Sequence, residues 1–221
     1  MSKALGVIGG MGPAATLAFL DRLQALTPAQ GDADHIRVLM DLNPQVPDRN
    51  TRPGEARRVL GEMAERLRTA GAEILAMPCN TAHAQADEIR AAGLPFLDMI
   101  AITIDRAATA GVQRIGVLAT PGGEALYSAA LQARGVSPLV LEGDDRAAFM
   151  GLVYGVKRGE IGAPARAEMR RLAGALVEAG AQALIAGCTE IPLLLPPDEA
   201  PAPLTDSAEA LAQACVAACL T

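Results

Sequence analysis

Residues 74–83 read ILAMPCNTAH, and they combine the signals of a strand, a turn and a helix. The first four residues are apolar and predict a short buried strand. A turn of small polar residues follows, and from about Thr81 to Ala92 the sequence is compatible with a helix. The stretch therefore predicts a strand–turn–helix unit in which Cys79 lies at the carboxyl end of the strand and near the start of the helix.

The same arrangement returns in the second half of the chain. Residues 183–186, Ala-Leu-Ile-Ala, form another short apolar run, which leads into Gly187-Cys188-Thr189-Glu190. At the start of a helix, free backbone N–H groups and the positive end of the helix dipole favour a thiolate over a thiol. Two cysteines at equivalent strand ends therefore indicate function, whereas either one alone could equally be a small buried hydrophobe.

Strands and helices alternate along the whole sequence. We expect strands over residues 5–8, 36–40, 74–77, 96–97, 114–119, 137–141 and 183–186. We expect helices over residues 13–26, 55–70, 81–92, 101–110, 124–134, 145–157, 163–179 and 207–220. The stretches 41–53 and 196–203 are rich in Pro and are expected to be loops. This alternation predicts an α/β fold with parallel sheets covered by helices on both faces.

The two halves of the sequence look like a distant internal duplication. Each half has a glycine-containing turn after its first strand, at residues 9–12 and 120–123. Each half also has a cysteine turn further along.

Composition limits the possible classes of function. The chain has 221 residues, 51% of them hydrophobic, which allows one large or two small domains with a core of Ala, Leu, Val and Ile. Its formal net charge is −6 and no basic run exceeds two residues, so the sequence carries no electrostatic footprint for nucleic acid. No apolar run approaches the roughly 18–20 residues of a membrane span. We therefore expect neither a nucleic-acid partner nor a membrane partner.

The N-terminus and the cysteines indicate a compartment. Residues 1–8 read directly as a first strand and lack the long apolar region of a signal peptide. A cytoplasmic location is expected, where the four cysteines are more consistent with thiols than with disulfides. The last helix would place Leu211, Cys215 and Cys219 on one apolar face, so we interpret these two cysteines as core residues.

The strongest rival signal is the glycine turn after the first strand. Residues 10–15, Gly-Met-Gly-Pro-Ala-Ala, match the G-x-G-x-x-A form of a dinucleotide fingerprint, and Asp41 could hold the ribose. This interpretation predicts a nicotinamide-dependent oxidoreductase. However, Pro13 is unusual in that motif. A glycine turn that lets a ligand or another backbone approach closely explains these residues equally well.

Histidines and cations supply further candidates. A zinc site is not expected, because the chain has no C-x-x-C and only two histidines. His83 would lie at the same helix start as Cys79, which argues against a catalytic pair of the two. We therefore expect an orienting or structural role for His83. Neither role is expected for His35. In the long loop, the Arg49 guanidinium could clamp a carboxylate, and Lys157 is a second candidate cation. For both cations, an ordinary solvated side chain is the alternative.

Together, these residues resemble the aspartate/glutamate racemase family, and most closely its cofactor-independent aspartate racemases. The matching pieces are Gly9–Pro13, Asn43-Pro44, Pro47–Arg49, Pro78–His83, Leu118–Thr120, Gly155–Lys157 and Gly187–Glu190. They span nearly the whole chain in the right order, and the two cysteine motifs jointly carry the specificity. The Asp-Ser turn and the Cys-Thr-His motif of the glutamate racemases of cell-wall synthesis are replaced here by Gly9-Gly10 and Cys188-Thr189-Glu190.

The resemblance implies two pseudo-symmetric flavodoxin-like lobes with parallel sheets and an active site in the cleft between them. The first lobe would comprise residues 1–100, completed by the C-terminal helix 206–221, and the second lobe residues 101–205. The resemblance further implies a homodimer that racemises an acidic amino acid without a cofactor. Aspartate is the expected substrate, with glutamate or a broader range of amino acids as alternatives.

The resemblance also implies roles for individual residues. The two acid/base thiols would be Cys79 and Cys188. The α-carboxylate and the ammonium group of the substrate would be held by Asn80, Thr81, Thr120 and Thr189. The side-chain carboxylate would be bound by Arg49 and Lys157, and Met11 would also contact the substrate.

The implied chemistry agrees with the residue types. Inversion of a stereocentre by proton transfer needs a base on one face and an acid on the other, and helix N–H groups can bring a thiol pKa from about 8.5 towards neutrality. Other cysteine-pair enzymes remain alternatives within the family: a hydantoin racemase, a maleate isomerase or a decarboxylase. A non-catalytic amino-acid-binding protein is an alternative from a different class.

Overall fold

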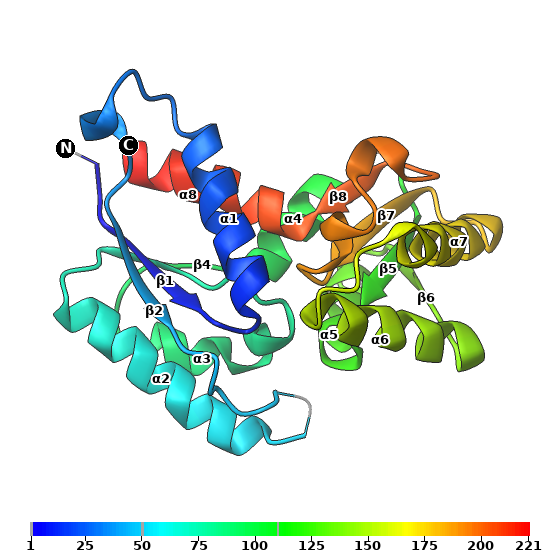
Figure 1. The fold of residues 1–221 in the computed structure, drawn as a ribbon, viewed down its shortest axis with the longest axis horizontal. Coiled ribbons are helices and arrows are strands. Elements are labelled where there is room, and N and C mark those ends of the chain that lie inside the picture. The colour runs from blue at the N-terminus through cyan, green and yellow to red at the C-terminus, as the bar shows by residue number, and fades with distance from the viewer. Residues whose placement is uncertain (1, 50, 110) are drawn as a thin grey trace. The chain divides into compact units, whose positions relative to one another are not determined.

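The structure is a computed structural model that describes residues 2–49, 51–109 and 111–221. It contains two compact units, one formed by Met1–Ile102 with Ala208–Thr221 and the other by Thr103–Ser207. Each unit holds one four-stranded sheet (Figure 1). The C-terminal segment therefore belongs to the first unit, although it follows the second unit in the sequence.

The sheet of the first unit is parallel and has the strand order β2-β1-β3-β4. Its strands are β1 (Leu5–Gly9), β2 (Val38–Leu42), β3 (Ile74–Ala76) and β4 (Phe96–Leu97). Its helices are α1 (Pro13–Leu26), α2 (Pro53–Thr69), α3 (Ala86–Arg90) and α8 (Ser207–Leu220), and α4 (Met99–Ala107) leads into the second unit. Parallel strands need long crossover connections, and α1, α2 and α3 lie in those connections.

Both faces of the first sheet are covered, because alternate side chains of a strand point to opposite faces. Leu5 and Val7 of β1 belong to a cluster that includes buried residues of α1 and α8: Phe19, Leu23, Leu211, Cys215 and Cys219. Ile8 of β1 and Leu75 of β3 belong to another cluster, which includes α2 residues Leu60, Met63 and Leu67. The prediction that Cys215 and Cys219 are core residues is confirmed.

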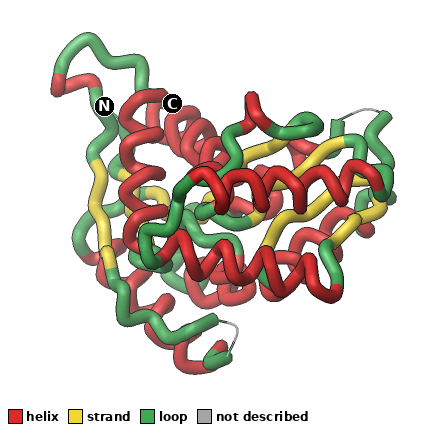
Figure 2. The backbone as a smooth tube through the Cα atoms, turned by 45° about the vertical axis from the view of Figure 1, so that its right-hand side comes forward, coloured by secondary structure: helices red, strands yellow, loops and turns green. Residues whose placement is uncertain are grey.

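The second unit repeats this topology. Its parallel strands are β5 (Arg114–Ala119), β6 (Ser137–Val140), β7 (Ala183–Gly187) and β8 (Leu204–Asp206), in the order β6-β5-β7-β8. Its helices are α5 (Pro121–Gln132), α6 (Gly143–Lys157) and α7 (Ala163–Glu178). Figure 2 shows the strands of the sheets with helices packed alongside them. β3 and β7 therefore occupy equivalent places in the two sheets.

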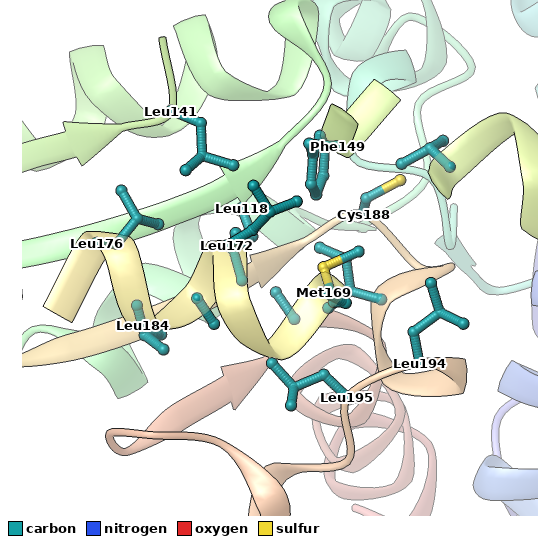
Figure 3. Packing of buried hydrophobic residues seen from close by; sticks show 14 of the residues in the cluster. Leu118, Leu141, Phe149, Met169, Leu172, Leu176, Leu184, Cys188, Leu194 and Leu195 are labelled. Carbon is teal, nitrogen blue, oxygen red and sulfur yellow. The ribbon is translucent and has the colours of Figure 1, made fainter. Parts of the chain in front are cut away.

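The core of the second unit reaches the carboxyl end of β7. Leu118 of β5 and Leu184 of β7 share one cluster with Phe149 of α6 and Leu172 of α7, and Cys188 belongs to the same cluster (Figure 3). The apolar sides of α6 and α7 are thus buried against this sheet.

A glycine at matching positions lets the central strand of each sheet approach its neighbour. Gly6 of β1 pairs with Leu75 of β3, and a Cβ atom on Gly6 would lie 2.7 Å from the Leu75 side chain. Gly116 of β5 pairs with Leu184 of β7, and there the corresponding distance is 2.6 Å. Real Cβ atoms do not come that close to other heavy atoms. The leucine of each cysteine-bearing strand therefore fills the space left by the glycine.

The predicted α/β class is confirmed, whereas three local expectations were wrong. The helix expected over residues 81–92 begins as a 3₁₀ turn, Thr81–Gln85, and only Ala86–Arg90 is α-helical. β2 runs from Val38 to Leu42 instead of 36–40, because Leu42 still pairs with Gly9. β8 was not expected at all, because its three residues follow a Pro-rich stretch and are too few to show the alternation of apolar and polar residues that is typical of a strand.

The other helix bounds differ by a few residues. α5 begins at Pro121 and not at residue 124, which agrees with the preference of Pro for the first helical turn. α4 begins at Met99 and ends at Ala107, and the predicted end at Ala110 lies outside the described residues.

Within the described part of the chain, no helix is long and apolar enough to cross a membrane.

Gly10 and Gly71 have similar positive φ angles but different surroundings. Substitutions at these two positions therefore distinguish the cost of backbone strain from the cost of a steric clash. Gly10 has φ +99° and a Cβ atom there would lie 2.4 Å from the backbone of Asn43, whereas Gly71 has φ +96° and open space around it. We expect Gly71→Ala to lower the free energy of unfolding by about 1–2 kcal/mol, the cost of a positive φ. Gly10→Ala should cost about 3 kcal/mol or more, because the backbone must also move.

Urea denaturation followed by circular dichroism would measure both variants. Equal losses for Gly10→Ala and Gly71→Ala would contradict the close approach of the two backbone segments.

Candidate active site

Each sheet carries one cysteine at the same place in its topology. Cys79 comes shortly after β3 and Cys188 directly after β7. In an open parallel sheet of order 2-1-3-4, the crossover direction reverses between the first and third strands, and ligands bind at the carboxyl ends of the strands there. Each unit therefore presents a thiol at the position where this kind of sheet binds ligands.

The glycine turn after β1 lies against the loop that follows β2. The Asn43 N–H donates a hydrogen bond of 3.2 Å to the Gly9 carbonyl, and the close approach at Gly10 is to the backbone of the same Asn43. The Gly10 N–H donates to the Thr16 hydroxyl over 3.0 Å. Asp41, the expected ribose partner, forms an ion pair of 2.8 Å with Arg66. The glycine turn thus accommodates the chain's own backbone, as one of its two interpretations predicted.

Packing brings this loop next to Cys79. Met11, Val46 and Cys79 belong to one buried cluster, with exposed fractions of 6%, 7% and 5%. Arg49 follows three residues after Val46, so the expected cation lies on the loop that packs beside the thiol.

Arg49 has an unsatisfied buried nitrogen. Its Nε atom is the one buried side-chain nitrogen or oxygen without a hydrogen-bond partner in the described ranges. Its Nη1 atom makes only a long contact of 3.5 Å with the Pro47 carbonyl. A buried polar group without a partner costs about 1–3 kcal/mol, so such a group calls for an acceptor. A bound carboxylate would supply one.

Buried polar residues follow both thiols in the sequence. Asn80 and Thr81 follow Cys79 with exposed fractions of 3% and 8%. In the second unit, Thr120 lies at the end of β5 and Thr189 follows Cys188, with exposed fractions of 6% and 8%. The predicted binding residues therefore group by unit: Asn80 and Thr81 follow β3 in the first unit, whereas Thr120 follows β5 and Thr189 follows β7 in the second.

His83 binds the backbone through both ring nitrogens. Nδ1 donates a hydrogen bond of 2.9 Å to the Cys79 carbonyl, and Nε2 accepts one of 3.0 Å from the Met99 N–H. The ring also stacks on Phe96, with 5.3 Å between the ring centroids. Burial lowers the pKa of His83 below its ordinary value of 6.5, so the ring is neutral with its proton on Nδ1. His83 ties the cysteine turn to the start of α4, which is the structural role that was expected.

Cys188 is bonded to a carboxyl group. Its thiol donates to Oε2 of Glu190 over 2.9 Å, and the Thr189 hydroxyl donates to the same oxygen over 3.3 Å. Glu190 is 5% exposed. Glu190 belongs to the second cysteine turn, and no role was predicted for it from the sequence. An acidic residue three positions after a buried strand was the signal that could have identified it.

Lys157 ends the helix that packs over the Cys188 region. Val153 and Val156 of α6 share the cluster of Cys188, and Figure 3 shows Phe149 of the same helix next to Cys188. Lys157 itself is exposed, and its Nζ atom lies 5.8 Å from the centroid of the Tyr154 ring. It forms no ion pair among the described residues, so its charge is available to an anion.

The remaining cysteines and His35 lie away from the two cysteine turns. Cys215 and Cys219 are core residues of α8, and burial raises the pKa of both thiols. His35 lines a surface hollow of about 310 Å³ between α1 and β2. In the part of the chain that the structure describes, no cluster of three or more His, Cys, Asp or Glu side chains could hold a metal ion.

Comparison with known proteins identifies similar chains. The family model described as Asp/Glu/hydantoin racemase matches residues 8–215. A glutamate racemase from Synechococcus sp. (strain CC9605) is 32% identical over 160 residues, which cover 69% of this chain and 57% of that protein. The chain spans about half the length of the curated relatives it matches.

Solved structures that are similar over nearly the whole chain include the following two. The crystal structure of a putative Asp/Glu racemase from Yersinia pestis has a TM-score of 0.86 and 29% identity, and covers 99% of this chain and 100% of that chain. An aspartate racemase from Picrophilus torridus has a TM-score of 0.85 and 27% identity, and covers 98% and 94% of the two chains.

The buried neutral imidazole predicts a loss of stability in acid. As the pH falls below about 6.5, the unfolded chain binds a proton at His83 that the folded protein cannot bind, because the Met99 N–H occupies Nε2. The free energy of unfolding should therefore fall by up to about 1.4 kcal/mol per pH unit until the pH reaches the lowered pKa. Urea denaturation between pH 7.5 and 5 would measure it.

Two variants test the assignment to His83. His83→Gln should lower stability at pH 7.5 by about 1–3 kcal/mol, since its hydrogen bonds are imperfectly replaced, and should flatten the pH dependence. The control, His35→Gln, leaves His83 in place and should keep the wild-type slope. An unchanged slope in His83→Gln would refute the assignment.

Proposed function

Because the chain belongs to the Asp/Glu/hydantoin racemase family, we propose that it racemises an acidic amino acid without a cofactor, by proton transfer between two thiols. The observation that carries this proposal is the pair Cys79 and Cys188 at equivalent strand ends of two sheets with the same topology. One lobe, residues 1–100 with 206–221, would supply one thiol, and the other lobe, residues 101–205, would supply the second.

The two thiols would act on opposite faces of the α-carbon. One sulfur, as the thiolate, removes the α-hydrogen as a proton, and the other, as the thiol, delivers its proton to the opposite face. After one turnover the roles of Cys79 and Cys188 are exchanged, so the reverse reaction starts from the product state. Proton transfer by a positioned group of suitable pKa contributes about 10²–10⁴-fold to the rate.

The carbanion formed between the two transfers needs stabilisation. We propose that Asn80, Thr81, Thr120 and Thr189 hold the α-carboxylate and the ammonium group. Hydrogen bonds to that carboxylate strengthen as negative charge spreads into it from the α-carbon, in the manner of an oxyanion hole. The burial of all four side chains supports this role, since donors that are already out of water need little reorganisation.

Two cationic side chains without an ion pair among the described residues indicate a substrate with an acidic side chain. We propose that Arg49 and Lys157 bind the side-chain carboxylate and that Met11 contacts the substrate. The unsatisfied Nε of Arg49 supports this assignment, because a carboxylate can accept two parallel N–H bonds from a guanidinium. The named relatives include both an aspartate racemase and a glutamate racemase. We propose aspartate as the main substrate, because Cys188-Thr189-Glu190 stands where the glutamate racemases of the resemblance have Cys-Thr-His.

We also propose that the protein is a homodimer. Leu17 of α1 and Met40 and Leu42 of the edge strand β2 are exposed, with fractions of 57%, 40% and 38%, and a second copy would remove them from water. Sedimentation equilibrium on the full chain would test this. The cytoplasmic location expected from the sequence stays a prediction.

The two-thiol mechanism predicts a large loss of racemisation in either cysteine variant. Cys79→Ser and Cys188→Ser should each lower the rate by at least about 10³-fold, because a hydroxyl is a far weaker acid than a thiol. The assay is NMR of α-hydrogen exchange and optical rotation of L-aspartate and L-glutamate in D₂O, with no added cofactor. Cys215→Ala, in the core of the first unit, is the control and should stay active.

Near-normal racemisation by Cys79→Ser or Cys188→Ser would refute the two-base mechanism. Binding of aspartate by the wild-type protein without exchange of its α-hydrogen would identify a binding protein instead. An absorbance change with a nicotinamide cofactor would favour the oxidoreductase alternative.

The proposed role of Arg49 predicts a loss of affinity that depends on the substrate. Arg49→Gln should raise KM for aspartate by about 10–100-fold with a smaller change in kcat, because the guanidinium binds a part of the substrate that does not react. With asparagine, which lacks the charge, wild type and variant should differ little. Equal effects on aspartate and asparagine would place Arg49 in a different role.

A further inference from the structure

Glu190 is a buried carboxyl group whose charge has no cationic partner. It is 5% exposed, and among the described residues no lysine, arginine or histidine forms an ion pair with it. Its Oε2 atom accepts hydrogen bonds from the Cys188 thiol and the Thr189 hydroxyl, over 2.9 and 3.3 Å. Burial of a carboxylate without a cation is unfavourable, because desolvation penalises the charged form. Its position against one of the two proposed acid/base sulfurs therefore needs an explanation.

We propose that Glu190 is the proton partner of Cys188. Its carboxylate takes the thiol proton of Cys188 while the sulfur receives the α-hydrogen of the substrate, and it returns that proton when Cys188 acts as the acid. In the first direction the existing S–H bond breaks, an O–H bond forms on Glu190, and a new S–H bond forms with the α-hydrogen. This inference rests on the proposed function.

The turn of the first unit has a different chemistry. Cys79 is followed by Asn80 and Thr81, an amide and a hydroxyl, and neither takes up a proton at neutral pH. The ring nitrogens of His83 are both committed to the backbone. Cys188 can therefore remain a thiol between turnovers and pass its proton to Glu190, an acceptor that has no counterpart in the two residues that follow Cys79.

The arrangement has a consequence in the absence of substrate. A negative carboxylate beside a sulfur disfavours a second negative charge on that sulfur, so Cys188 should be a hydrogen-bonded thiol that reacts slowly with alkylating reagents. Other ionisable groups on the elements packed here include Tyr127 of α5, Lys157 of α6 and Asp206 of β8, besides the Arg146–Glu124 ion pair between α6 and α5. All of these groups remain in Glu190→Gln, so the difference from wild type isolates the Glu190 charge.

The first arm of the test measures Cys188 without substrate. Wild type and Glu190→Gln are treated with iodoacetamide from pH 5.5 to 10, and the alkylated peptides are quantified by mass spectrometry. Cleavage after glutamate places Cys188 in residues 179–190 of the wild type or 179–199 of the variant, apart from the other three cysteines. The midpoint of Cys188 alkylation should fall by about one pH unit in Glu190→Gln, and that of Cys79 should stay in place.

The second arm measures racemisation. Glu190→Gln should lower the rate of α-hydrogen exchange on aspartate by about 100-fold, because the amide cannot accept the proton. The variant thus makes the Cys188 sulfur more reactive towards iodoacetamide and less effective in catalysis, which a merely structural residue would not do. Glu190→Asp keeps the charge and should keep the high alkylation midpoint of the wild type even where its activity falls.

Glu178→Gln is the matched control. Glu178 is an exposed residue at the end of α7, and its removal changes the net charge by the same amount. It should leave both the alkylation profile and the exchange rate unchanged.

The outcomes separate the two proposals. If the wild type exchanges the α-hydrogen and Glu190→Gln does so at the same rate, or if the Cys188 midpoint does not fall, the proton partnership alone is refuted. If the wild type catalyses no exchange on either acidic amino acid, the proposed function and the partnership fail together. A lower midpoint with a lower exchange rate in folded Glu190→Gln, judged by circular dichroism, supports both.

Discussion

Gly6 and Gly116 leave space on the central strands that Leu75 and Leu184 of the neighbouring strands fill. A Cβ atom at either glycine would meet that leucine, and at Gly6 it would also lie 2.8 Å from the Ala72 Cβ atom, so the neighbouring side chains would have to shift. Within each sheet, the leucine fits beside the glycine in one register of the strand pair. In that register, the turn after the central strand lies beside the turn that carries the cysteine. The placement of both thiols therefore depends on a contact inside the sheet, several residues before the site.

Much of the fold was predictable because it is encoded locally. Buried parallel strands are short apolar runs, and the helices between them have an apolar face, so the α/β alternation is visible in the sequence. Features that depend on distant residues were not visible. β8 exists because Leu204–Asp206 pairs with β7. The 3₁₀ start of residues 81–85 accompanies a hydrogen bond from His83 to the turn carbonyl and another from Met99, sixteen residues further along.

The candidate site likewise has features that the sequence predicts and features that only the structure shows. The cysteines could be identified from sequence, because a strand end is a local feature and its partner in the second half repeats it. The sequence also marked Arg49 and Lys157 as candidate cations. It could not show that the Arg49 Nε is buried without an acceptor, or that the Cys188 thiol turns towards Glu190, since both depend on side-chain orientation. The residue types of a site are thus more predictable than the proton positions in it.

The assignment of α8 to the first unit affects how the chain folds as it leaves the ribosome. The second unit, Thr103–Ser207, is continuous and can close its core as soon as its last strand is made. The first unit cannot, because Leu211, Cys215 and Cys219 of α8 cover one face of its sheet. Although it is synthesised first, its apolar surface stays open to solvent and chaperones until Ala208–Thr221 has emerged. The order of synthesis and the order of completion are therefore reversed.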